Sequence, residues 1–191
     1  MNLPNKITIG RLVAVPFLLI ALLLYGRTGE TGYYSAALVI FALAVLSDGL
    51  DGYLARSGNQ KTRLGTLLDP LADKILLDST IIILALGVGD IFRIPVWFVL
   101  IVISRDLFLL VISLFLHQRW SRGTIQIRPN WWGKTAAVLL MATVVWILIH
   151  PHYPPHLLTW VALYITALFT VVSGGVYLIR TLKELRIPKP H

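Results

Sequence analysis

Four aspartates lie close together in a chain that is otherwise strongly apolar. The chain has 191 residues, of which 57% are hydrophobic and 14% are charged, yet the stretch from residue 48 to residue 73 contains Asp48, Asp51, Asp69 and Asp73. Carboxylate oxygens are the ligands that hard divalent cations such as Mg²⁺, Mn²⁺ and Ca²⁺ prefer. Facing carboxylates repel one another and become protonated unless a cation lies between them. This stretch therefore predicts a site for one or two divalent metal ions.

Two helix faces are predicted from the spacing of the acids and of the small residues among them. One set recurs at intervals of three and four residues: Asp48, Asp51, Gly52 and Ala55. A second set recurs at intervals of four: Gly65, Asp69 and Asp73. Such intervals place side chains on one face of a helix, and a connection of only about ten residues makes the two helices neighbours. We expect these helices to be antiparallel, with their acidic faces together.

Small residues and an arginine accompany the acids. Gly52, Ala55 and Gly65 leave space beside the helices, and Arg56 follows the first acidic set directly. Metal-bound carboxylates, an arginine and free space together favour a bound phosphate or pyrophosphate, whose oxygens a metal ion bridges to the carboxylates. For the small residues taken alone, close packing of membrane helices is the commoner use.

Apolar segments long enough to cross a bilayer, which takes about 20 residues each, recur along the chain, whose mean hydropathy is +0.76. We predict an all-α integral membrane protein with a single transmembrane domain over residues 1–191. Its six transmembrane helices are expected at 7–26, 33–54, 67–88, 93–117, 131–150 and 157–180.

Basic residues gather on one side of these expected helices. With the N-terminus inside, the inner set of basic residues includes Arg11, and the outer connections keep only Arg27 and Arg93. Because Lys and Arg beside membrane helices are retained on the cytoplasmic side, the acidic site should face the cytoplasm from a bacterial-type inner or plasma membrane. The net charge of +8 should then meet membrane lipids or an anionic substrate. No nucleic-acid partner is expected, since no binding module surrounds the basic residues.

The pattern D-x2-D-G-x2-A-R-x8-G-x3-D-x3-D, complete from Asp48 to Asp73, resembles the signature of the CDP-alcohol phosphatidyltransferase family. The N-terminal NLPNKITIGRL resembles the family's usual opening. The resemblance implies the CDP-alcohol phosphotransferase fold of six transmembrane helices, a homodimer, and an active site open to the cytoplasm.

The resemblance also assigns roles to the motif residues. It implies that two divalent ions, Mg²⁺ or Mn²⁺, are bound by the four acids: Asp48, Asp51, Asp69 and Asp73. Asp73 would also be the catalytic base. The residues implied to bind the CDP-lipid are Gly52, Ala55, Arg56 and Gly65. The implied reaction is attack by an acceptor hydroxyl on the lipid-bearing phosphorus of CDP-diacylglycerol, with release of CMP and without a covalent intermediate.

The acceptor is predicted from residues outside the motif. Phosphatidylglycerophosphate synthases of the family commonly show SRE followed by a second arginine eight residues after the first, where this chain has Asp106 and Ser113 in ISRDLFLLVIS. The segments LDPLADKIL, ISRD and RPNWWGKT are more similar to phosphatidyltransferase-type cardiolipin synthases, which use phosphatidylglycerol. We therefore expect phosphatidylglycerol as the glycerol-type acceptor, with glycerol 3-phosphate and then inositol phosphate as alternatives.

Basic residues that suit any of these acceptors are Arg105, Arg119, Arg122, Arg128 and Lys134. For the arginines of the loop after the fourth predicted helix, contact with lipid headgroups is an equally good interpretation. A different class of protein, a divalent cation transporter, also places acids in membrane helices. It is less well supported, because all four acids of the motif lie at one membrane face.

Overall fold

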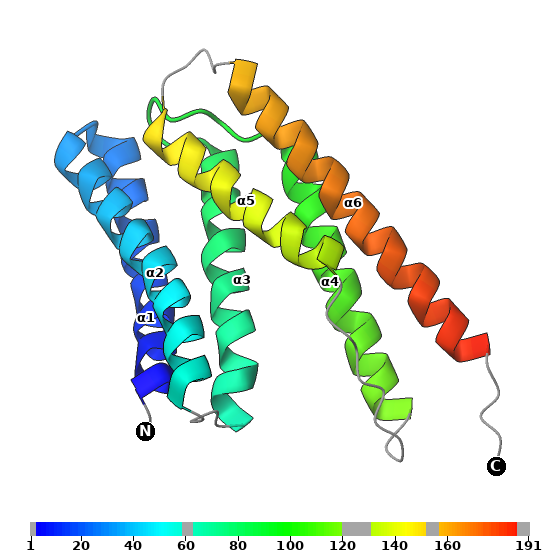
Figure 1. Cartoon of the computed structure of the whole chain (residues 1–191). Helices are drawn as coiled ribbons and strands as arrows, with labels where there is room; N and C mark the ends of the chain where they lie inside the picture. The colour runs from blue at the N-terminus through cyan, green and yellow to red at the C-terminus, as the bar shows by residue number, and fades with distance from the viewer. Residues whose placement is uncertain (1–2, 59–62, 120–130, 152–156, 187–191) are drawn as a thin grey trace. The chain divides into compact units, whose positions relative to one another are not determined.

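The computed structural model describes residues 3–58, 63–119, 131–151 and 157–186, and it is helical throughout most of this part of the chain (Figure 1). The side chains of residues 3–7, 48–58, 63–70, 113–119 and 182–186 lie outside this description. The helices are α1 (Leu3–Thr28), α2 (Thr31–Gly58), α3 (Arg63–Leu86), α4 (Val96–Arg119), α5 (Trp131–Ile149) and α6 (Leu157–Arg186). The predicted all-α class and the six helices are confirmed.

Three helical stretches in the described residues are long and apolar enough to cross a membrane. They are Thr8–Thr28, Trp131–Ile149 and Leu157–Thr181. In α2 the described apolar part is Thr31–Ser47, and in the sequence the acidic motif begins directly after it. The acidic motif thus lies at the end of α2 and the start of α3.

Local backbone chemistry sets the helix boundaries that differ from the predicted ones. The fourth helix begins at Val96 rather than near residue 93, because a residue before proline avoids helical geometry and Pro95 follows Ile94. The Pro95 carbonyl then accepts from Phe98 N at 3.0 Å. At the end of α3, Gly87 adopts a φ of 93°, and Arg93 Nε donates to the Ala85 carbonyl at 2.8 Å.

Unit 1, the first of two compact parts of the chain, comprises Met1–Ile94 and Ile147–Pro154. Within it α1 packs against both α2 and α3. Its core includes Leu18 and Leu22 of α1 and Leu76 and Ile81 of α3, which are at most 2% exposed. Packing of apolar side chains against α1 therefore orients the two helices that contain the acidic motif.

Unit 2 comprises Pro95–Trp146 and Pro155–His191. In this unit α4 packs against α6, and polar side chains join α5 to α6. Thr143 and Thr166 share a hydrogen bond of 2.8 Å between their hydroxyls, and Trp146 Nε1 donates to Thr159 Oγ1 at 3.1 Å. Bonds of this kind are common between membrane helices, where water is not available as a partner.

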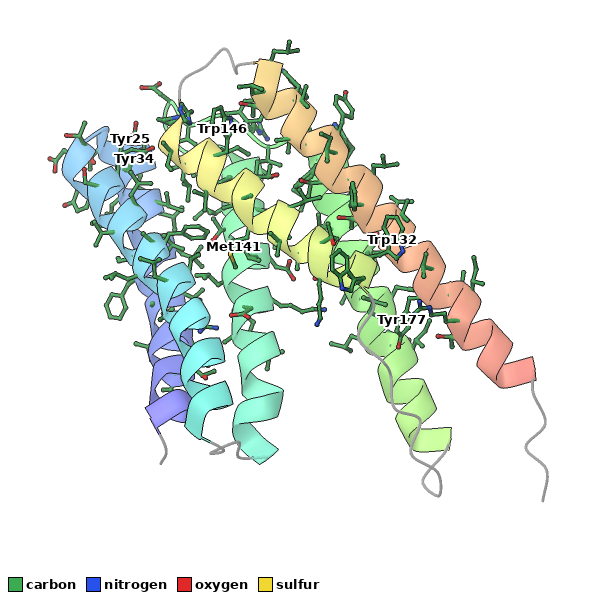
Figure 2. All side chains as sticks on the ribbon, viewed as in Figure 1. Tyr25, Tyr34, Trp132, Met141, Trp146 and Tyr177 are labelled. Carbon is green, nitrogen blue, oxygen red and sulfur yellow. The ribbon has the colours of Figure 1, made fainter. Side chains whose placement is uncertain are left out.

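Aromatic side chains cluster at the helix ends that we predict to lie outside. In unit 1 the rings of Tyr25 and Tyr34 are 5.2 Å apart, and Figure 2 shows them together at the end of α1 and the start of α2. In unit 2 Tyr164 stacks on Trp97 with the ring centroids 5.3 Å apart. Tyr and Trp are enriched at both membrane–water interfaces, so these clusters suit helix ends that lie at such an interface.

Gly89 offers a test of the packing at this end of unit 1. Its φ is 51°, and a Cβ there would lie 3.1 Å from Tyr25 Cε1. Gly29 has a φ of 71° with no atom within 4 Å of the corresponding position. Gly29→Ala should cost about 1–2 kcal/mol of backbone strain alone. Gly89→Ala should cost more, because the Tyr25 ring must also move. Thermal unfolding followed by circular dichroism would show the difference, and equal melting temperatures would contradict the packing.

Candidate active site

The acidic motif occupies the last turns of α2 and the first turns of α3, which only residues 59–62 connect. A helix rises by about 1.5 Å per residue. Measured from these connected ends, Asp48 and Asp73 each lie about 15 Å along their helices, and Asp51 and Asp69 about 10 Å. The two helices run in opposite directions (Figure 1), so the backbone positions of the four acids fall at two matching levels.

An ion pair joins α1 to α3 within unit 1. Arg11 Nη1 donates to Asp73 Oδ1. The side chain of Arg11 is 1% exposed, whereas that of Asp73 is 30% exposed. The cation is therefore enclosed by protein, while the carboxylate that it holds keeps an accessible part. This arrangement fixes one carboxylate of the motif and leaves it open to a ligand.

Sequence reasoning missed the role of Arg11, which we used only as one of the basic residues that indicate the cytoplasmic side. A signal was present, because Arg11 lies inside the apolar stretch that begins at Thr8. A charge at membrane depth costs about 3 kcal/mol even on the lenient insertion scale, so it calls for a buried partner. That partner, Asp73, is far away in the sequence, and only the packing of α1 against α3 brings the two together.

Three of the four predicted metal ligands, Asp48, Asp51 and Asp69, have side chains outside the described residues. Within the described side chains no three metal-ligating groups converge. The chemistry of the donor set fits a hard divalent cation, because it consists of carboxylate oxygens. The predicted CDP-binding residues Gly52, Ala55, Arg56 and Gly65 lie on the same turns of α2 and α3, and their side-chain positions also lie outside the described residues.

A second charged cluster lies in unit 2. Arg105 of α4 donates from Nη1 to Asp106 Oδ1 at 2.5 Å and from Nη2 to Ser173 Oγ of α6 at 3.1 Å. Its side chain is 16% exposed and that of Asp106 is 12% exposed. The guanidinium also lies close to the first turn of α5, since a Cβ on Gly133 would be 3.3 Å from Arg105 Nη2; Figure 2 shows Trp132 on the same turn. The predicted Arg105–Asp106 pair is therefore present, and Ser173 is a partner that sequence reasoning missed.

The other predicted acceptor residues are less well defined. Lys134 is exposed in the first turn of α5. Arg119 is the last residue of α4, and its side chain lies outside the described residues. Arg122 and Arg128 lie outside them altogether. The structure thus brings Arg105 to the start of the helix that contains Lys134.

Residues 1–172 match the CDP-alcohol phosphatidyltransferase family. The chain belongs to this family. Members depend in general on divalent metal ions, which agrees with four carboxylates in the signature. The predicted family and enzyme class are confirmed. Membership of this family favours a transferase over a divalent cation transporter.

Curated relatives match along nearly the whole chain. A probable phosphatidylglycerophosphate synthase from Mycobacterium tuberculosis is 35% identical over 96% of this chain and 83% of its own length. CDP-diacylglycerol–glycerol-3-phosphate 3-phosphatidyltransferases from Bacillus subtilis and Pseudomonas fluorescens are 34% and 32% identical, over 97% and 100% of this chain and 97% and 92% of their own lengths.

These names favour glycerol 3-phosphate, our alternative acceptor, over phosphatidylglycerol, which we expected first. The expectation rested on Asp106 in place of the glutamate of SRE, on Ser113 in place of the second arginine, and on the likeness of LDPLADKIL, ISRD and RPNWWGKT to cardiolipin synthases. In the structure the shorter Asp106 side chain still accepts from Arg105 at 2.5 Å. Asp106 therefore provides the carboxylate that we had associated with glutamate. The presence of Asp106 in place of glutamate thus carries less information about the acceptor than we assigned to it.

Replacing Arg11 should destabilise the protein more than replacing an exposed arginine of the same helix. Arg11→Gln removes the buried cation beside Asp73, whereas Arg27→Gln acts in the exposed last turn of α1. We expect a loss of about 1–3 kcal/mol, below the usual cost of breaking a fully buried pair because Asp73 is partly exposed. The thermal unfolding midpoints of the purified proteins would give the comparison.

The double variant Arg11→Gln/Asp73→Asn tests whether the loss comes from the ion pair. When the pair is responsible, Asp73→Asn costs less stability in the Arg11→Gln background than in the wild type, because the carboxylate has already lost its partner. Strictly additive effects, or equal midpoints for Arg11→Gln and Arg27→Gln, would contradict the pairing.

Proposed function

We propose that this protein transfers the phosphatidyl group of CDP-diacylglycerol to a hydroxyl of glycerol 3-phosphate, with release of CMP. The observation that carries this proposal is the likeness along nearly the whole chain to relatives named for that reaction. The complete acidic signature supports the reaction class, and the cationic cluster around Arg105 supports a phosphate-bearing acceptor.

In the proposed mechanism the acids of unit 1 hold the donor's headgroup. Asp48, Asp51, Asp69 and Asp73 would ligate two divalent ions, Mg²⁺ or Mn²⁺. When bound, such ions neutralise pyrophosphate charge and stabilise the departing phosphate. Gly52, Ala55 and Gly65 would leave space for the CDP moiety, and Arg56 would pair with its phosphate.

Asp73 would take the proton of the attacking hydroxyl. In this step the acceptor oxygen forms a bond to the lipid-bearing phosphorus, the phosphorus–oxygen bond to CMP breaks, and CMP leaves with the electron pair. A general base needs an accessible carboxylate in a fixed position. The buried Arg11 supplies the fixed position, and the exposed part of Asp73 supplies the access.

Arg105 would bind the phosphate of the acceptor. The guanidinium lies against the first turn of α5, where unpaired backbone N–H groups and the helix dipole favour an anion. Lys134 adds a positive charge on the same turn. The single counter-charge of Asp106 leaves this cluster cationic. A phosphomonoester such as glycerol 3-phosphate has up to two negative charges, so it suits the cluster better than the singly charged diester of phosphatidylglycerol.

The proposal includes the setting of the reaction. All six helices would cross the membrane, and the acidic site would face the cytoplasm, where CMP and glycerol 3-phosphate are soluble. The donor's two acyl chains would stay in the bilayer while its headgroup reaches the acids at the ends of α2 and α3. A homodimer in a bacterial-type inner or plasma membrane is the expected assembly.

CMP release by the purified protein in detergent tests the proposal. With CDP-diacylglycerol and Mg²⁺, release should depend on glycerol 3-phosphate, and phosphatidylglycerol or inositol phosphate should give at most a few per cent of that rate. Asp73→Asn should lower the rate by at least about 100-fold, in the range for loss of a general base. Asp90→Asn, at an exposed acid, should leave it unchanged.

Other outcomes would point elsewhere. Release that depends on phosphatidylglycerol would restore the cardiolipin synthase interpretation. Normal turnover by Asp73→Asn would remove Asp73 as the base. Divalent cation flux into vesicles without CMP release would favour the transporter class.

A further inference from the structure

The surroundings of Arg105 contain residues that neither the signature nor the acceptor motifs include. Ser173 of α6 accepts a hydrogen bond from Arg105 Nη2 at 3.1 Å and is itself only 2% exposed. Ser173 and Gly174 come directly after residues 1–172, which match the family. The buried hydroxyl therefore lies beyond the part of the chain from which family membership was established.

Two glycines leave the space that the arginine occupies. A Cβ on Gly133 of α5 would lie 3.3 Å from Arg105 Nη2 and 3.4 Å from Ser173 Oγ. A Cβ on Gly174 of α6 would lie 3.6 Å from Arg105 Cγ. By contrast, a Cβ on the adjacent Gly175 would meet no atom within 4 Å. A Cβ on Gly133 would thus press against the guanidinium, whereas one on Gly174 would make only an ordinary van der Waals contact with the Arg105 side chain.

The guanidinium still has hydrogen-bond donors to spare. Its five N–H groups include Nε, which is buried and has no hydrogen-bond partner among the described residues. The edge formed by Nε and an Nη group is the one that binds phosphate or carboxylate oxygens in pairs. Because a buried N–H without an acceptor is costly, an anion against this edge would complete the cluster.

We propose that Ser173, together with the space left by Gly133, positions the Arg105 guanidinium so that its Nε edge binds the phosphate of the acceptor. Ser173 is a positioning residue in this arrangement, since its hydroxyl holds Nη2 and does not contact the reacting atoms. The inference rests on the proposed function. It adds that acceptor affinity depends on a contact between α4 and α6 and on a close approach of α5.

Steady-state kinetics of the full-length protein with CDP-diacylglycerol and varied glycerol 3-phosphate tests this inference. Ser173→Ala should raise KM for glycerol 3-phosphate by about tenfold, the typical effect of losing a hydrogen bond to a charged group. The kcat and the KM for CDP-diacylglycerol should change by less than about twofold. Ser173→Thr, which keeps a hydroxyl, should recover much of the affinity. Gly133→Ala should raise the same KM, and its matched control Gly175→Ala should not.

A double variant separates positioning from a general loss of packing. If Ser173 acts through Arg105, then Ser173→Ala should raise the KM for glycerol 3-phosphate little further in the Arg105→Lys background. The guanidinium that Ser173 orients is absent from that variant. The inference is overturned if Ser173→Ala leaves the KM for glycerol 3-phosphate unchanged, or if Gly133→Ala and Gly175→Ala behave alike. Equal changes in both substrates' KM values would also overturn it. A wild-type protein without glycerol 3-phosphate-dependent CMP release would instead refute the proposed function.

Discussion

The cost of placing charges among apolar helices is the constraint on which the rest of the structure depends. A chain with this hydrophobic content can keep an ionisable side chain at depth only beside a partner. Unit 1 meets the constraint by pairing Arg11 with Asp73 across α1 and α3, and unit 2 by pairing Arg105 with Asp106 on α4. Around both pairs the described helices are packed through apolar and hydroxyl side chains.

The same constraint explains how a hydrophobic protein can handle a strongly charged reaction. A fixed carboxylate and a fixed guanidinium do not have to reorganise when charge moves between phosphate groups, which is the main advantage of a preorganised site over water. The exposure values separate the roles. The side chain of Arg11 is enclosed and contacts only protein, so its role is to fix Asp73. The side chains of Asp73 and Arg105 are each partly exposed, so a ligand could reach them.

Helix number, helix position and the acidic signature could be predicted from the sequence because each depends on local patterns. Long apolar stretches predicted the helices, and the acidic motif predicted that two antiparallel helices meet at a short connection, as α2 and α3 do. Arg11 and Ser173 could not be assigned in this way. Their partners lie 62 and 68 residues away, and no local pattern says which charge in one helix meets which group in another. The space left by Gly133 around Arg105 is likewise visible only once α4 and α5 are packed. The names of the relatives favour our alternative acceptor over the one expected first, which rested in part on reading Asp106 in place of glutamate as a difference in chemistry.

The most direct test of the central claim follows carbon-labelled glycerol 3-phosphate into lipid. The purified protein would be incubated with CDP-diacylglycerol and Mg²⁺, and the organic extract would be analysed by mass spectrometry. The proposed reaction predicts a labelled lipid that contains two phosphates, one from the donor and one from the acceptor, formed in equal amount with CMP. CMP formed without label in the lipid, or a product with a single phosphate on the labelled glycerol, would contradict it.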